Sequence, residues 1–232
     1  MATPCAQDYY CCMAQISTVA QPPRAQSLGE ELANSLSHGL GLALAIAGLP
    51  VLIATSVHTG NAAAVVGASV FGGTAILLYL VSTLYHALPQ RRLKEVLQVL
   101  DHVAIYLFIA STYTPFTLGV LHGGWGWTLL GLVWTLALAG VVFKILGGTR
   151  FPRVSTLLYL AMGWVILVAI RPLWLHMPAA GLAFLVAGGV AYTVGVVFFA
   201  LDERVRYSHF IWHLFVLAGT VCHFFAVLLY AA

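Results

Sequence analysis

The chain has 232 residues, of which 61% are hydrophobic and 7% are charged, and its formal net charge is +3. Because about a quarter of the residues of a soluble domain are charged, this composition excludes a soluble domain and indicates a polytopic membrane protein. In a membrane protein the total charge says little, and the positions of the charged residues along the loops are what is informative. We expect no nucleic-acid partner.

Residues 1–29 contain no long apolar run and include the Pro22-Pro23 pair, so we expect a disordered cytoplasmic tail there. Residues 30–232 are expected to form one transmembrane domain. The cysteines of the tail have neither metal-binding nor redox spacing, which favours ordinary reduced thiols, with acylation as the alternative. These cysteines are Cys5, Cys11 and Cys12.

Seven apolar runs follow, each long enough to cross a hydrocarbon core of about 30 Å, which takes about 20 helical residues. They lie at 36–57, 62–85, 97–118, 125–143, 154–170, 179–201 and 209–230. The breaks between them carry glycine, proline or charged residues, and no hydrophilic insert is long enough for a second domain. The sequence therefore predicts an all-α fold, a bundle of seven transmembrane helices.

The run at 179–201 contains Gly181, Gly188 and Gly195 at seven-residue intervals. Small residues at this spacing lie along one side of a helix and let a neighbouring helix approach closely. We therefore expect a packing seam on this helix rather than a ligand site.

The basic residues predict the orientation of the bundle. Cytoplasmic loops of membrane proteins carry an excess of Lys and Arg. One side of the predicted topology has only Arg171. The other side holds Arg24, Arg91, Arg92, Lys94, Lys144, Arg150, Arg153, Arg204 and Arg206. The amino terminus is therefore expected in the cytoplasm and the carboxyl terminus outside.

Three histidines fall at one depth near the expected cytoplasmic face. His209 and His213 open the last run four residues apart, so they share one helical face and lie close enough for one metal ion. His86 closes the second run, and Asp101, a carboxylate inside a membrane span, follows at the start of the third. The alternative to a metal site is that each histidine is an interfacial or hydrogen-bonded core residue.

Three imidazoles leave a zinc ion an open fourth position, where the pKa of bound water falls to about 7. Asp101, which is not a ligand in this scheme, is then a candidate base that passes the proton to a leaving amine. Ser82 is a candidate oxyanion donor, although a serine in a membrane helix more often bonds its own i−4 carbonyl. His38 and His102 either orient the ligands or are interfacial.

The chain resembles the hemolysin III branch of the progestin and adipoQ receptor family, and it is similar to the bacterial members. The resemblance covers nearly the whole chain from Glu30 onward. The motifs that carry it are Glu30-x3-Asn34-Ser35-x2-His38, Ser82-x3-His86, Leu100-Asp101-x3-Ile105 and Ser208-His209-x3-His213.

This resemblance implies a seven-helix bundle with zinc near the cytoplasmic face, held by His86, His209 and His213. It places Asp101 beside the water on the zinc and Ser82 one turn from His86. The ligands are then expected to be oriented by Glu30, Asn34, His38 and His102. The wider superfamily includes alkaline ceramidases, and members of the branch have also been called hemolysins and linked to membrane lipid homeostasis.

Together these features predict a zinc-dependent, ceramidase-like hydrolase of a membrane lipid amide or ester, in the inner membrane of a bacterium. Its substrate or ligand is expected to be a membrane lipid, and an oligomer is possible. Two alternatives stay open, namely a lipid-sensing receptor with structural zinc and a pore-forming cytolytic protein. The spans lack a sustained polar stripe, which disfavours a pore within one chain.

Overall fold

The computed structural model describes residues 24–121 and 123–231, and within these ranges the chain is almost entirely helical and contains no strand. The predicted all-α fold is thereby confirmed. Most of the predicted tail, including Cys5, Cys11 and Cys12, lies outside the described residues.

Seven helical segments are long and apolar enough to cross a membrane, which confirms the predicted number of spans. Six spans are single helices, and the fifth is built from α6, the 3₁₀ segment η1 and α7. The elements are α2 (Leu28–His58), α3 (Ala62–Ala87), α4 (Arg91–Gly119), α5 (Gly123–Gly147), α6 (Pro152–Gly163), η1 (Val165–Ala169), α7 (Ile170–His176), α8 (Ala179–Ala200) and α9 (Ser208–Tyr230).

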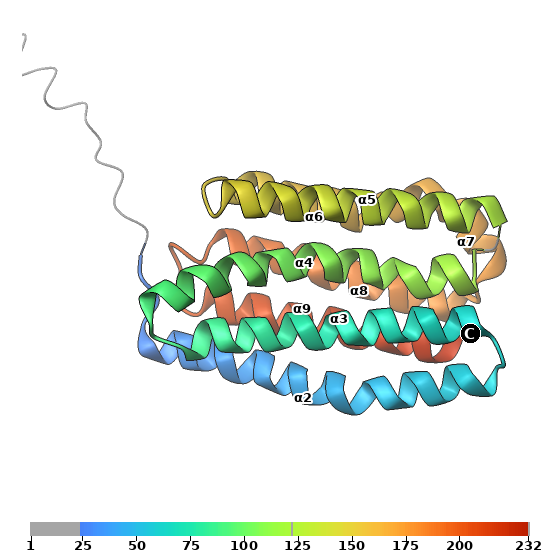
Figure 1. Ribbon diagram of the computed structural model, residues 1–232, viewed down its shortest axis with the longest axis horizontal. Coiled ribbons are helices and arrows are strands. Elements are labelled where there is room, and N and C mark those ends of the chain that lie inside the picture. The colour runs from blue at the N-terminus through green and yellow to red at the C-terminus, as the bar shows by residue number, and fades with distance from the viewer. Residues whose placement is uncertain (1–23, 122, 232) are drawn as a thin grey trace, which may run out of the picture.

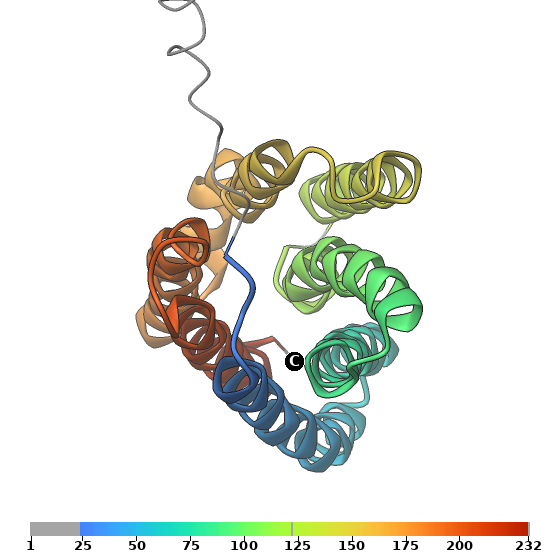
Figure 2. The same ribbon diagram turned by 90° about the vertical axis from the view of Figure 1, so that its left-hand side faces the viewer.

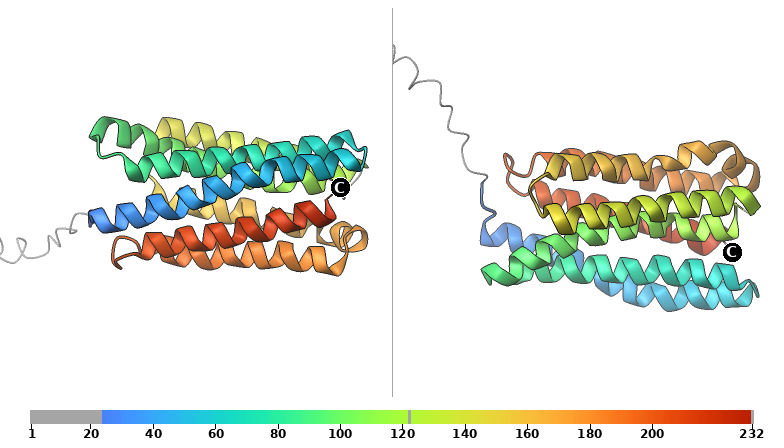
Figure 3. Two further views of the ribbon diagram at one scale, coloured as in Figure 1. Left: turned by 90° about the horizontal axis from the view of Figure 1, so that it is seen from below. Right: turned by 45° about the horizontal axis from the view of Figure 1, so that its top comes forward.

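The spans run alternately up and down and form a ring (Figures 1 and 2). Neighbours in sequence are neighbours in space, and α2 closes the ring against α9, as the view from below also shows (Figure 3). The connections α3–α4, α5–α6 and α8–α9 lie at one end of the bundle, which we call the basic end (Figure 1). Arg24 lies there too, because its guanidinium donates to the carbonyl oxygen of Asp202 in the α8–α9 connection. All nine basic residues assigned to one side of the predicted topology lie at or near this end.

Helix α2 begins at Leu28, ahead of the apolar run predicted from residue 36. Its first turn is fixed by a capping box, in which the Ser27 hydroxyl accepts from the Glu30 amide and the Glu30 carboxylate accepts from the Ser27 amide. The helix therefore extends through two polar turns that an apolar count does not include. The second of these turns carries Asn34 into the bundle, and His38 follows one turn later.

The fifth span is interrupted where α6 ends and η1 begins, at Trp164. The hydroxyl of Tyr113 on α4 contacts the carbonyl oxygens of Met162 and Gly163, each at 2.7 Å, and accepts from the Ile166 amide at 3.2 Å. Irregular backbone at membrane depth requires such partners, because the lipid offers none. A side chain of α4 thus stabilises the break.

The three glycines of α8 all face α9. A Cβ atom placed on Gly181, Gly188 or Gly195 would collide with side chains of α9, including those of Tyr230, His223 and Trp212 respectively. The predicted packing seam is therefore confirmed, and it brings α9, which carries two of the three histidines, close to α8.

Candidate metal centre

The three histidines at the basic end converge although they come from two helices far apart in sequence. His86 lies in the last turn of α3, and His209 and His213 lie in the first two turns of α9. One ligand nitrogen from each ring can be chosen so that all three lie within 4.8 Å of one another, and the ring centroids are 4.7 to 5.1 Å apart. This cluster can hold a metal ion.

The His86 ring is oriented by α2. Its Nδ1 atom lies 2.8 Å from Oε2 of Glu31 and 3.5 Å from Nδ2 of Asn34. The other carboxylate oxygen of Glu31 accepts from Nζ of Lys94 at 2.5 Å. An acceptor at Nδ1 favours the tautomer that carries its proton there, which leaves Nε2 free to bind a metal.

The two histidines of α9 are oriented in the same way. Nδ1 of His209 lies 2.9 Å from Oδ2 of Asp202 in the α8–α9 connection. Nδ1 of His213 lies 3.2 Å from the carbonyl oxygen of Asn34 and 3.2 Å from Oγ of Ser37. All three rings therefore have a protein acceptor at Nδ1, as metal-binding histidines commonly do.

The free nitrogens fit a metal. Nε2 of His86 is buried and has no hydrogen-bond partner among the described residues, which is costly for a polar atom unless a ligand binds there. Ligand atoms around a tetrahedral zinc ion, with bonds of about 2.0–2.1 Å, lie roughly 3.3 Å apart. The chosen nitrogens all lie within 4.8 Å of one another, so no pair would need to close by more than about 1.5 Å.

Asp101 and Ser82 lie next to this cluster. The Ser82 hydroxyl is beside the Asp101 carboxyl group, and Ser82 Oγ is buried with no partner at hydrogen-bond distance among the described residues. Asp101, Ser82, His209 and His213 all line one cavity. A carboxylate and a free hydroxyl thus face the space in front of the histidines.

Two of the remaining predicted residues contact the clustered histidines. Asn34 touches both His86 and His213, and the His38 ring stacks on the His213 ring with centroids 3.5 Å apart. His102 instead bonds the carbonyl oxygen of Gln98 through Nδ1, at 2.6 Å, although its side chain lines the same cavity.

Glu30 has a different role from the ligand-orienting one expected. Its carboxylate accepts from Arg24 at 2.6 and 2.8 Å and from the Tyr207 amide at 2.9 Å. The hydrogen bond to Glu30 raises the pKa of the Arg24 guanidinium above its ordinary value. No hydrogen bond joins Glu30 to the described histidines. Glu30 ties the start of α2, which orients His86 and His213, to the start of α9, which carries two of the three histidines.

Sequence reasoning did not single out Glu31, Asp202 or Ser37. Glu31 precedes the apolar run predicted from residue 36, and Asp202 lies between the last two runs. A usable signal was the Ser27-x-x-Glu30 capping box, which starts the helix early enough to place Glu31 and Asn34 on one face of α2.

The cavity in front of the histidines has a volume of about 1370 Å³ and reaches from Arg150 and Arg204 at the basic end to Phe116 deep in the bundle. It also opens sideways. Leu157 of α6 and Val186 of α8 line the cavity and are nevertheless 66% and 58% exposed, so the wall between these helices is incomplete. This side of the bundle faces the hydrocarbon of the membrane.

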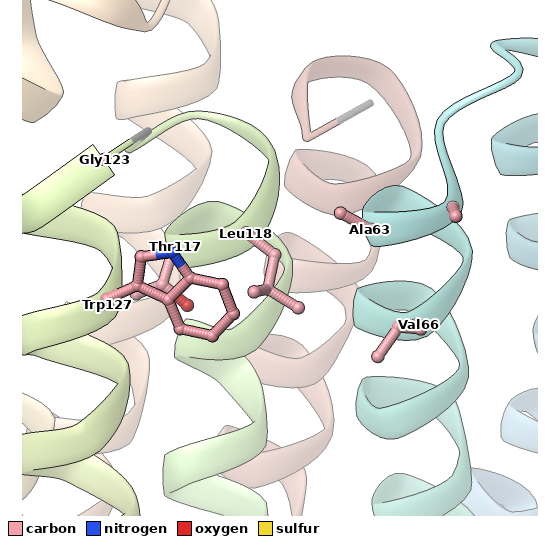
Figure 4. A pocket seen from close by; sticks show the side chains of 7 residues that line it. Ala63, Val66, Thr117, Leu118, Gly123 and Trp127 are labelled. Atoms are coloured by element: carbon pink, nitrogen blue, oxygen red, sulfur yellow. The ribbon is translucent and has the colours of Figure 1, made fainter.

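A second, smaller cavity of about 340 Å³ lies at the opposite end of the bundle, between α3, α4 and α5 (Figure 4). Its lining includes Val66, Leu118 and Trp127, and it contains no ionisable side chain. This small cavity therefore offers no group for chemistry that needs charge or a metal.

Comparison with known proteins agrees with the resemblance in the motifs. A family model described as Haemolysin-III related matches residues 26–224. The chain is 48% identical to Hemolysin-3 of Bacillus cereus over 205 residues, which cover 88% of this chain and 93% of that protein. It is 45% identical to the Hemolysin-3 homolog of Bacillus subtilis (strain 168) over 204 residues, 88% and 95% of the two chains.

A more distant relative is the human Monocyte to macrophage differentiation factor, which is 28% identical over 207 residues, 85% of this chain and 83% of that protein. The bacterial relatives match almost from end to end, and the seven apolar helices agree with a protein embedded in a membrane. The chain therefore belongs to the haemolysin-III-related family and is an integral membrane protein of the bacterial plasma membrane.

Proposed function

We propose that this protein is a zinc-dependent hydrolase that cleaves an amide or ester bond of a membrane lipid, in the manner of a ceramidase. The observation that carries this proposal is that four features occur together at one large cavity, which His209 and His213 of the cluster line. These are the three-histidine cluster, the Asp101 carboxylate, the free Ser82 hydroxyl and a side opening towards the membrane. A purely structural metal site needs neither a nearby carboxylate nor an opening towards the membrane.

The donor set suits zinc, because three neutral imidazoles leave it dipositive with one open position. When bound there, Zn²⁺ would act as a Lewis acid towards the carbonyl oxygen of the lipid. Asp101 would accept a proton from the attacking water at a carboxylate oxygen and donate it to the leaving amine or alcohol. The Ser82 hydroxyl would donate a hydrogen bond to the oxygen on which negative charge develops.

The shape of the cavity supports a lipid as the substrate. An acyl chain entering between α6 and α8 would lie along apolar side chains such as Leu157 and Val186, while its polar head reached the histidines. The nine-to-one distribution of basic residues supports a cytoplasmic position for the basic end, with the carboxyl terminus outside. The enzyme would then act on lipids of the inner leaflet, which suits a role in membrane lipid homeostasis.

The test is to purify the protein, measure its zinc content and incubate it with labelled ceramide and other labelled lipid amides and esters. We expect release of the fatty acid that stops when a chelator removes the metal and resumes when zinc is restored. Stoichiometric zinc without any product from the whole panel would instead favour a lipid-sensing receptor with structural zinc.

A cytolytic pore is the second candidate, because the bacterial relatives carry the name Hemolysin-3. Liposomes containing the protein separate the two functions. A hydrolase should leave them tight to small dyes while the lipid amide is slowly cleaved. Rapid leakage that is independent of zinc and gives no lipid product would favour the pore.

A further inference from the structure

Lys144 is buried in the wall of the large cavity. It lies in the last turn of α5, its side chain lines the cavity, and the residue is 1% exposed. Its Nζ atom reaches one polar partner, Oγ of Ser155 on α6, at 3.4 Å. An ammonium group removed from water with a single long hydrogen bond is costly, because nothing nearby neutralises its charge.

The two helices that place Lys144 and its partner Ser155 offer no counter-charge. The sequence contains no Asp or Glu between Asp101 and Asp202, so α5, α6 and the connection between them carry no acidic residue. Arg150 and Arg153 of this region line the same cavity. Among the described residues, none of these three cations forms an ion pair.

The exposed arginines have an ordinary explanation, since basic residues accumulate in the loops on one side of a membrane. Lys144 does not share it, because a residue selected only for topology belongs at the surface. Lys144 lines the cavity together with two further cations and forms no ion pair among the described residues, although Asp101 and Asp202 line the same cavity. A buried cation without a partner in a cavity wall is the arrangement expected of an anion-binding site.

We propose that the lipid bound in this cavity carries an anionic group, a phosphate or a carboxylate, which Lys144 binds together with Arg150 and Arg153. This inference deepens the proposed function and rests on it for the reaction, but not for the binding. The two parts of the cavity then bind different parts of the lipid. The bond to be cleaved lies before the histidines of α3 and α9, and the anionic group lies against the α5–α6 wall.

Native mass spectrometry of the zinc-loaded full chain in neutral detergent tests the binding directly. The protein is titrated with phosphatidylglycerol, palmitate or uncharged diacylglycerol, and the affinity for each is measured. The wild type should prefer an anionic lipid by roughly tenfold, as expected for one charge-assisted contact. A preference for phosphatidylglycerol identifies phosphate as the bound group, and a preference for palmitate identifies carboxylate.

Three variants separate a specific site from general charge. Lys144→Met should lose the preference with its zinc content unchanged, and it should not be less stable, because it removes an uncompensated buried charge. Lys144→Arg keeps the charge and should keep the preference. The matched control is Arg171→Gln, which removes the same charge at an exposed position outside the cavity and should bind like the wild type.

The outcomes also separate this inference from the proposed function. Selective binding that depends on Lys144, without hydrolysis of any lipid, would support the anion site and count against the enzyme. Zinc-dependent hydrolysis that Lys144→Met leaves unchanged for anionic and neutral lipids alike, with no binding preference, would overturn the anion site and leave the enzyme standing. Equal loss of preference in Lys144→Met and Arg171→Gln would also overturn it, because net charge alone would then explain the effect.

Discussion

Replacing Glu31 by Gln tests how the metal centre is organised. The substitution keeps the shape of the side chain but removes the negative charge that bonds Nδ1 of His86 at 2.8 Å and Nζ of Lys94. Loss of a carboxylate that orients a metal-binding histidine typically weakens metal affinity 10- to 100-fold. This corresponds to about 1.4 to 2.7 kcal/mol of binding free energy. The assay is competition for zinc between the purified protein and a chromophoric chelator.

Glu30→Gln is the matched control, because it makes the same chemical change at the adjacent residue of the same helix. Glu30 bonds Arg24 and the Tyr207 amide but no described histidine. We expect it to lower thermal stability, by about 1 to 3 kcal/mol for hydrogen bonds to a charged group, with little change in the zinc affinity of the folded protein. Unchanged zinc affinity in Glu31→Gln, or an equal loss in both variants, would refute this reasoning.

Three further predictions concern topology, packing and catalysis. A reporter fused after Ala232 should be active only outside the cytoplasm, and cytoplasmic activity would reverse the orientation. Gly188→Ala should destabilise the protein by about 1 to 3 kcal/mol in thermal unfolding, because the new methyl group meets the His223 ring. In the control Gly189→Ala the methyl group meets nothing within 4 Å, so this variant should be as stable as the wild type or slightly more stable. Ser82→Ala should keep its zinc and lose roughly 10²- to 10³-fold in turnover, the usual effect of removing an oxyanion donor, and full turnover would remove Ser82 from the reaction.

The helices and the cluster His86, His209 and His213 could be predicted because both follow from periodicity and depth. Apolar runs of sufficient length mark the spans, and the alternation of helix direction places the end of one span beside the start of another. The i, i+4 spacing of the pair on α9 then needs only one partner at the same level. These inferences depend on local sequence and on topology, which a single chain reveals.

The partners of the ligands could not be predicted in the same way. Which of the adjacent residues Glu30 and Glu31 contacts His86 depends on the rotation of α2 about its axis, and this rotation is set by packing against α3 and α9. Asp202 lies in a charged loop whose path depends on the α8–α9 contact. The break after α6 depends on Tyr113, which is remote in sequence. The partners of the histidines and the break in the fifth span therefore depend on contacts between distant elements, which local sequence patterns do not reveal.

The central claim is that the three histidines bind the metal and that Asp101 acts as the base, and variants of these four residues test it most directly. The measurement is zinc per protein together with turnover of a labelled lipid amide for His86→Ala, His209→Ala, His213→Ala and Asp101→Asn. Each histidine variant keeps only two ligands and should lose zinc, turnover and thermal stability together, because metal binding is coupled to folding. Asp101→Asn keeps the size of the side chain but not its basicity, so zinc should stay while turnover falls by roughly 10²- to 10⁴-fold. Full turnover in Asp101→Asn, or full zinc in a protein that lacks both His209 and His213, would contradict the account.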